Sequence, residues 1–441
     1  MKYVAYPKSE VMSNRIRQHY HLFQQQFITN LEKVESIEAG STSSAAYHTF
    51  LDITNPNAPR MRFKIQRDEN LVQKMKDVMK KSNPKMHRPN VLVLMIDSIS
   101  RQHFFRKLPK TRKFLESFYK NQKTEEISKN EQKDTSTKFS SYQFFRFHSL
   151  RQHHMANLLA LRYDDREYWE AIHHWERFEN NYKDEGYITA TASAKCEVDE
   201  FDLEDNKKSK RYPDHRALDY EFFAAACDPN ATPKQDPHSM FKGPFSEFRR
   251  CLYGQDASKH QLEFTKEFWR VYKDMPKVQM VTLMDGHEFT GEVVEYLDHH
   301  LVEFFKAMME EGLLDDSIIF ILSDHGNNSN LFFKGTASGM NELVSPFLAM
   351  MMSANNAKKY GEIVRKNEQA LVSHHDVNRA INEIVRVYKE YAGQNFMTHE
   401  VDKGRTCGDA MIPPGFCRCL HPRGVDLNRL ERKKHYGGGR V

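Results

Sequence analysis

The expected fold is decided by the stretch Ser317-Ile318-Ile319-Phe320-Ile321-Leu322-Ser323-Asp324-His325-Gly326. Its first six residues form an apolar, β-prone run, which is typical of a strand covered on both faces. Gly326 then allows the backbone to turn sharply. Open α/β sheets hold ligands at the carboxyl ends of their strands, so we expect Asp324 and His325 to lie where chemistry takes place. A carboxylate oxygen beside an imidazole nitrogen is a donor pair that suits Zn²⁺ or Mn²⁺.

Two other strand-like runs end in the same way. Residues 90–96 are mostly apolar and are followed by Asp97, and residues 278–284 are followed by Asp285 and His287. Uninterrupted apolar runs of this length favour central parallel strands, whose carboxyl ends meet at one edge of a sheet. Three strand ends that carry acidic or imidazole side chains indicate a shared metal site rather than three separate turns.

Strand-like and helix-like segments alternate along the rest of the chain. Helical periodicity is clear over residues 293–310 and again over 376–388, and we expect further strands at 187–192 and 348–352. A short helix is expected at 220–224. This alternation predicts an α/β fold with a large, mostly parallel central sheet sandwiched between helices.

Length and charge narrow the class of protein. A chain of 441 residues is long enough to bury a large core. Its net charge of +5 is small, and the basic residues are scattered among nearly as many acidic ones, so we expect no nucleic-acid partner. No apolar run approaches the length of a membrane span, and the first residues lack the apolar core of a signal peptide.

The six cysteines point to a compartment other than the cytosol. The Pro- and Gly-bearing segment 407–419 has little apolar periodicity, which favours a loop held by disulfides. A zinc knuckle is the alternative, although no Cys-x-x-Cys spacing supports it. Asn230 and Asn327 begin glycosylation sequons. The cysteines are Cys196, Cys227, Cys251, Cys407, Cys417 and Cys419.

Three regions are expected. Residues 1–85 form a polar, mainly helical lead-in, residues 86–400 form the α/β domain, and residues 401–441 form a cysteine-rich tail. We expect the protein outside the cell or in the secretory-pathway lumen, with an amino-terminal signal or membrane anchor missing from this chain.

Several motifs together resemble a family. The chain is similar to the sulfatase-like family of unknown function that is found in nematodes and insects, within the alkaline-phosphatase superfamily. The segments that carry the resemblance are Pro89–Arg101, Leu108–Thr111, Gly286–Glu292, Tyr296–Asp298, Leu322–Gly326 and Arg405–Cys419. They occur in the family's order over roughly 330 residues, which is more specific than any single motif.

The resemblance implies a metal-centred site that cleaves phosphate or sulfate esters. Asp97, Asp324 and His325 would bind a divalent metal ion, which could be Zn, Mn or Ca. His287, with Asp285 beside it, would be a ligand at a second site or a substrate contact. The partner would be a small-molecule or glycan phosphate or sulfate ester.

The nucleophile departs from the family's pattern. His154 stands where relatives carry Thr, and Ser149 is a hydroxyl five residues upstream. No Cys-x-Pro-x-Arg occurs, which excludes formylglycine sulfatase chemistry. His153 and His375 are candidate substrate contacts, with surface or positioning roles as the alternative. In addition, Asn327–Asn330 occupies a stretch where relatives usually carry a basic residue.

Two functions from different classes follow. One is a metal-dependent phosphate or sulfate ester hydrolase, or a transferase using the same chemistry, with an altered nucleophile. The other is an inactive protein that keeps the fold for binding or assembly in the secretory pathway. A cytosolic α/β binding protein is a third reading, which only the bare amino terminus favours.

Overall fold

The computed structural model describes residues 2–4, 47–52, 60–119, 138–164, 177–193, 218–222, 251–252, 255–386 and 393–418. Cys196, Cys227, Cys419 and Asn230 lie outside these described residues. Among the described helices, none is both long and apolar enough to cross a membrane.

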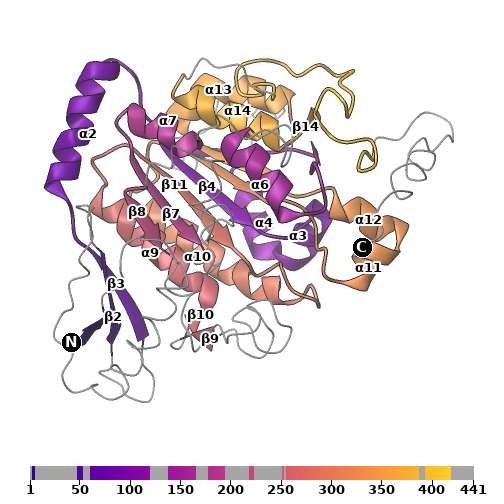
Figure 1. The fold of residues 1–441 in the computed structure, drawn as a ribbon, viewed down its shortest axis with the longest axis horizontal. Helices are drawn as coiled ribbons and strands as arrows, with labels where there is room; N and C mark the ends of the chain where they lie inside the picture. Colours follow the sequence, from indigo (N-terminus) through magenta and orange to yellow (C-terminus); the bar gives the residue numbers. More distant parts are fainter. Residues whose placement is uncertain are drawn as a thin grey trace, which may run out of the picture. The chain divides into compact units, whose positions relative to one another are not determined.

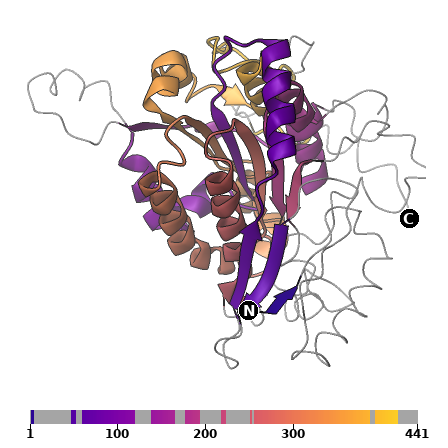
Figure 2. The same ribbon diagram turned by 90° about the vertical axis from the view of Figure 1, so that its left-hand side faces the viewer.

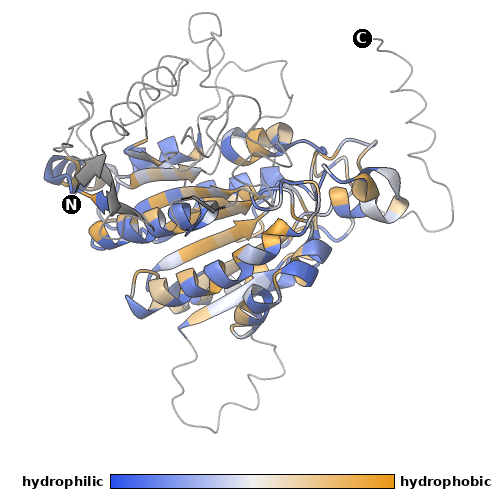
Figure 3. Cartoon of the chain, turned by 90° about the horizontal axis from the view of Figure 1, so that it is seen from below, coloured by the Kyte–Doolittle hydropathy of each residue, from blue (hydrophilic) through white to orange (hydrophobic). Residues whose placement is uncertain are grey.

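Seven strands form the central sheet, in the order β5-β13-β12-β4-β11-β7-β8. Nearly every described side chain of these strands is buried, and in Figure 3 the strands are largely hydrophobic. Each fully buried Ile, Leu or Phe side chain contributes about 1.5–3 kcal/mol. The strands are β4 (Asn90–Ile96), β5 (Phe139–Gln143), β7 (Ile188–Ser193), β8 (Tyr220–Phe222), β11 (Lys277–Leu283), β12 (Ser317–Leu322) and β13 (Leu348–Ser353).

Helices alternate with these strands along the chain, which confirms the predicted α/β class (Figure 1). They are α2 (Glu69–Ser82), α3 (Arg101–Lys107), α4 (Pro109–Glu116), α6 (His154–Tyr163), α7 (Phe178–Asp184), α9 (Ala257–Val271), α10 (Leu297–Glu310), α11 (Leu331–Gly335), α12 (Ala337–Leu343), α13 (Ala354–Lys366) and α14 (His374–Ile384). Smaller strands are β1 (Lys2–Val4), β2 (Tyr47–Asp52), β3 (Arg60–Ile65), β6 (Arg146–Phe147), β9 (Cys251–Leu252), β10 (Gln255–Asp256) and β14 (Leu371–Val372), and a 3₁₀ turn, η3, spans Val293–Tyr296.

The chain divides into two compact units, which we describe separately. The first unit contains Met1–Met95 and Ile172–Ile319, and the second contains Ile96–Ala171 and Phe320–Val441. In the first unit β11 pairs in parallel with β7, and β7 pairs in parallel with β8. Helix α9 packs against β7 and β11 on one face, and α7 contacts the same strands on the other face (Figures 1 and 2).

The amino-terminal part of the first unit contains strands as well as a helix. Strand β2 pairs antiparallel with β1 and with β3, forming the small sheet of Figure 2. Helix α2 begins at Asp68, whose carboxylate accepts a hydrogen bond of 3.0 Å from the amide of Leu71. That capping bond satisfies one of the amides left unpaired at a helix start.

The predicted helix at 220–224 is wrong, because Tyr220–Phe222 forms strand β8. Tyr220 and Phe222 are fully buried. The ring of Tyr220 lies near that of Phe268, and the ring of Phe222 stacks on that of Phe264. Alternate aromatic residues of this kind suit the pleated surface of an edge strand better than a short helix.

In the second unit, a buried network fixes helix α14 and the carboxyl-terminal loop. Arg405 makes two hydrogen bonds to the Asp376 carboxylate, of 2.7 and 2.9 Å, and both side chains are buried. Asp376 also completes the capping box with Ser373 at the start of α14. A disulfide joins Cys407 to Cys417. It confirms the predicted disulfide loop for this pair.

The disulfide loop supports helix α6. Cys407 belongs to a buried apolar cluster with Leu150 and Ala160, and Cys417 packs against that cluster. Helix α14 is tied to the same helix, since Asn378 donates to the carbonyl oxygen of Leu161 at 2.8 Å. Helix α6 is therefore held from two sides, and its first residue is His154.

Lys277, in the first unit, is a buried amine whose charge depends on pH. Burial lowers its pKa to about 7, although Asp274 and Asp316 oppose the shift. Its Nζ donates to the Oδ1 of Asn90 and to the carbonyl oxygen of Met275, both at 2.9 Å, and a neutral amine can make both bonds. Between about pH 7 and the unfolded-state pKa, the unfolded chain binds a proton that the folded chain has released. Stability due to Lys277 therefore rises with pH in that window.

We expect Lys277→Met to stabilise the protein most below pH 7, where the wild type must bury a charge. The advantage should shrink as the pH rises towards 10. Urea unfolding at pH 6, 8 and 9.5 measures it, with the exposed Lys358→Met as the matched control. If the stability difference between Lys277→Met and the wild type stayed constant with pH, burial would not lower the pKa of Lys277.

Candidate metal centre

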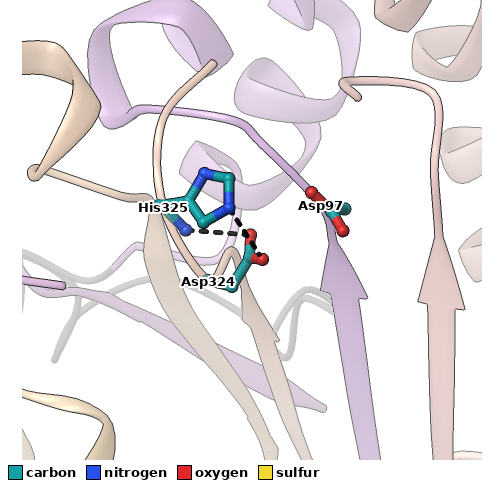
Figure 4. A group of neighbouring side chains, drawn as sticks. All are labelled: Asp97, Asp324 and His325. Atoms are coloured by element: carbon teal, nitrogen blue, oxygen red, sulfur yellow. Dashed lines mark hydrogen bonds and ion pairs between the residues drawn. The ribbon is translucent and has the colours of Figure 1, made fainter. Parts of the chain in front are cut away.

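Three predicted ligands come together in the second unit. Asp97, Asp324 and His325 are fully buried, and they offer ligand atoms that all lie within 4.8 Å of one another. Figure 4 shows Asp97 at the end of its strand, facing Asp324 and His325 at the end of another. No other group of three or more His, Cys, Asp or Glu residues with this spacing occurs in the described part of the chain.

Backbone turns hold the two strand ends together. Ser98 has a positive φ of 63°, an unusual conformation for a residue other than glycine. In that turn its amide donates to the Oδ1 of Asp324 at 3.0 Å, and its hydroxyl donates to the Oδ1 of Asp97 at 2.7 Å. The amide of Ile99 donates to the Oγ of Ser323 at 2.9 Å. These bonds fix both carboxylates before any ligand arrives.

One oxygen of the Asp324 carboxylate is held by backbone amides, and the other faces two imidazole rings. Its Oδ1 accepts hydrogen bonds from the amides of Ser98 and His325, at 3.0 and 2.8 Å. Burial and the charge of Asp97 raise the pKa of Asp324, but His325 and the hydrogen bond from His154 outweigh them, so that the pKa is lowered. Its Oδ2 lies 3.3 Å from the Nε2 of His325.

The tautomer of His325 is fixed by its neighbour. Its Nδ1 lies 2.6 Å from the carbonyl oxygen of Gly326, and since a carbonyl only accepts, Nδ1 carries the proton. When the ring is neutral, Nε2 keeps its lone pair; this atom is buried, makes no hydrogen bond among the described residues and lies 3.3 Å from the Oδ2 of Asp324. A metal-binding imidazole usually has this arrangement, with its other nitrogen held by a backbone carbonyl.

His154 completes the group from helix α6. Its Nδ1 lies 2.8 Å from the Oδ2 of Asp324 and 3.1 Å from the Oδ2 of Asp97. Asn157 holds the loop before it, because its Nδ2 donates to the carbonyl oxygens of Arg151 and His153, at 2.9 and 2.8 Å. The imidazole predicted at the nucleophile position thus lies against both carboxylates.

Other predicted site residues lie elsewhere. Ser149 is buried, and its Oγ has no hydrogen-bond partner in the described part of the structure. His375 is buried and its Nδ1 lies 2.7 Å from the Oδ1 of Asp164, whereas His153 is exposed at the start of α6. The roles of these residues stay predictions.

Asp285 and His287 follow β11 in the first unit and are not members of the three-residue group. Asp285 is buried and accepts a short hydrogen bond from the hydroxyl of Ser258. Burial raises the pKa of Asp285 to about 6, and the Ser258 bond opposes the shift. Metal binding by Asp285 and His287 stays a prediction.

The sequence pattern missed the residues that position the ligands. Ser98 and Ser323 hold the two turns, and the buried His374 lies with its Nε2 3.2 Å from the carbonyl oxygen of Ser323. Burial lowers the pKa of His374 to about 3, so its ring is neutral. The serines directly beside Asp97 and Asp324 are the one local signal that could have indicated this support.

The three ligands fit a divalent ion chemically. Two buried carboxylates repel each other, and a cation between them offsets that repulsion. Two carboxylate oxygens and one imidazole nitrogen form a donor set that suits Zn²⁺ or Mn²⁺.

The comparison with protein families supplies the assignment. The model described as "Protein of unknown function (DUF229)" matches residues 11–124 and 180–435. The chain belongs to this family. The assignment confirms the predicted membership of a family of unknown function. Asp97, Asp324 and His325 lie within the matched segments, whereas His154 and Ser149 lie between them. A comparison with curated proteins found no match.

Solved structures similar to this DUF229 chain are distant. The C-terminal periplasmic domain of EcEptC from Escherichia coli is 11% identical, with 77% of this chain and 90% of that chain covered and a TM-score of 0.43. A protein in the alkaline phosphatase superfamily from Vibrio parahaemolyticus is 14% identical, with 78% and 81% covered and a TM-score of 0.45. The lipoteichoic acid synthase LtaP from Listeria monocytogenes is 12% identical, with 63% and 71% covered and a TM-score of 0.37. These scores are low, so the family assignment rests on the sequence model.

The turn at Gly326, beside the ligands, packs closely against the backbone of Glu342 and Leu343. A Cβ added to Gly326 would lie 2.4 Å from the carbonyl oxygen of Glu342. The amide of Gly326 donates to the carbonyl oxygen of Leu343 at 2.8 Å. Because backbone must shift to admit a methyl group, Gly326→Ala should lower the free energy of unfolding by about 1–3 kcal/mol. Gly335→Ala is the control, since nothing lies within 4 Å of its added Cβ. Equal unfolding free energies for the two variants would contradict the tight turn.

Proposed function

We propose that this protein is a metal-dependent, hydrolase-like protein that acts on phosphate or sulfate esters and has His154 in place of the usual nucleophile. The observation that carries the proposal is the buried group of Asp97, Asp324 and His325, with His154 against both carboxylates. The three residues would hold a Zn, Mn or Ca ion, and zinc suits the nitrogen donor best.

Each ligand would contribute in a different way. Asp97 and Asp324 would supply negative charge, and their turns would keep the oxygens in place through the Ser98 contacts. His325 would bind through Nε2 while its Nδ1 stays bonded to Gly326. A bound ion would supply positive charge for the equatorial oxygens of a tetrahedral ester. The same geometry serves phosphate and sulfate.

The attacking group would be His154 or Ser149. The hydroxyls nearest the carboxylates are already used: Ser98 donates to Asp97, and Ser323 donates to the carbonyl oxygen of His325. That leaves His154, which would have to present a nitrogen with a free lone pair to the ester, and Ser149.

An inactive, metal-binding protein is the second candidate. One observation favours it, namely that Nδ1 of His154 is already engaged by Asp324 and Asp97. A ring held in this way faces the carboxylates rather than an incoming ester. In this form the protein would use its fold for binding or assembly.

For the active form we expect turnover of an aryl phosphate monoester, a phosphodiester or an aryl sulfate that depends on added Zn²⁺, Mn²⁺ or Ca²⁺. Asp324→Ala should abolish this turnover, whereas Asp77→Ala, which removes a half-exposed carboxylate of helix α2, should preserve it. Folded protein that binds metal but turns over none of the substrates would rule out the active form and leave the inactive one.

We further propose that the protein resides outside the cell or in the secretory-pathway lumen. The Cys407–Cys417 disulfide supports this, because such bonds persist in oxidising compartments. Of the two sequons, Asn327 is fully buried and its Oδ1 accepts the amides of Ser329 and Asn330, both at 3.0 Å. A glycan on Asn327 would not fit that turn.

The localisation proposal is tested at the other sequon. In secreting eukaryotic cells, we expect glycosidase treatment to lower the mass of the wild-type chain and to leave Asn230→Gln unchanged. Asn327→Gln is the control and should keep the wild-type shift. An unmodified wild-type chain recovered from the cytosol with reduced Cys407 and Cys417 would refute the proposal.

A further inference from the structure

We propose that Nδ1 of His154 is a fourth protein ligand, which closes the metal site formed by Asp97, Asp324 and His325. This inference rests on the metal-binding part of the proposed function, and it assigns His154 a role other than that of the nucleophile. It adds a second nitrogen donor to the two carboxylates and the imidazole of His325.

The spacing of the donor atoms supports this role. Ligand atoms around a tetrahedral zinc ion lie about 3.3 Å apart, given metal–ligand bonds of about 2.0–2.1 Å. Nδ1 of His154 lies 2.8 Å from the Oδ2 of Asp324 and 3.1 Å from the Oδ2 of Asp97. The Nε2 of His325 lies 3.3 Å from the same Asp324 oxygen. Three donor pairs thus already have separations near those of a tetrahedral shell.

The position of His154 is built into the fold. It is the first residue of α6, and Asn157 on the next turn fixes the preceding loop through the carbonyl oxygens of Arg151 and His153. The amide of Leu150 donates to the Oδ1 of Asn157 at 2.8 Å, so both ends of that amide group are used. The side chain of His154 is only 12% exposed. Its ring is therefore directed at the carboxylates rather than at solvent.

The carboxylates favour one ring atom over the other. Both short contacts involve Nδ1, the nitrogen nearer the backbone, and the same two Oδ2 atoms face it. In the structure this nitrogen donates a hydrogen bond to the Oδ2 of Asp324 and lies 3.1 Å from the Oδ2 of Asp97, and a metal ion would take the place of the shared hydrogen. Since Nδ1 would then hold the ion with its lone pair, that lone pair would not attack an ester.

Closure of the site has a chemical consequence. Catalytic zinc sites keep three protein ligands and an open position, whereas structural sites have four protein ligands. With His154 as the fourth ligand, the set becomes two carboxylates and two imidazoles. In the inactive, metal-binding protein proposed above, such an ion would stabilise the fold.

The test uses X-ray absorption at the zinc edge on the full chain loaded with one equivalent of Zn²⁺. We expect two imidazole ligands in the wild type and one in His154→Ala. The affinity for Zn²⁺, measured by chelator competition, should fall by more than about 100-fold in His154→Ala, since loss of an outer partner alone lowers it by about 10–100-fold. His299→Ala, which removes an exposed imidazole, should match the wild type in both measurements.

A single imidazole in wild-type protein would overturn the inference, and that result does not depend on whether a variant folds. A loss of affinity below about 100-fold in a folded His154→Ala or His154→Thr variant would overturn it as well. Failure of the wild type to bind Zn²⁺ at all would instead refute the metal site itself. In that case Asp324→Ala and the wild type would behave alike.

Discussion

The site depends on the placement of two negative charges in a fully buried space. Asp97 and Asp324 have no exposed surface, and each would prefer water to the interior of a protein. Backbone amides of Ser98 and His325 hold one oxygen of Asp324, and the hydroxyl of Ser98 holds one oxygen of Asp97. The oxygens that remain face imidazole nitrogens. Such a pair is stable only with a cation or with donated protons between the carboxylates, and this requirement explains both the metal proposal and the position of His154.

Local patterns predicted the strands that carry the site and the ligands at their ends. The apolar runs at 90–96 and 317–322 became β4 and β12 with the same bounds, because a fully buried strand needs apolar residues on both faces. Asp97, Asp324 and His325 follow these runs directly, so their proximity follows from the sheet. The failure at 220–224 has a local cause too, since a five-residue window does not separate a helix from an edge strand.

What the sequence did not reveal are contacts between distant segments. His154 and Asp324 are 170 residues apart, and no periodicity in either segment indicates that their side chains meet. The same holds for Arg405 and Asp376, and for the disulfide loop that packs beside Ala160. The resemblance predicted His154 at the nucleophile position, but only the structure shows which ring nitrogen faces which oxygen.

The turn after His325 and the start of α6 are joined by side-chain contacts. Asn327 is buried and caps its own turn, since its Oδ1 accepts the amides of Ser329 and Asn330. Its neighbour Asn328 donates to the carbonyl oxygen of Gln152 at 3.1 Å and so ties this turn to the loop before His154. The side chains of Asn327 and Asn328 thus hold backbone, and that of His154 contacts carboxylates. Such contacts suit the metal-stabilised form proposed above, and an active hydrolase on the same scaffold would need a group to bind and attack its ester.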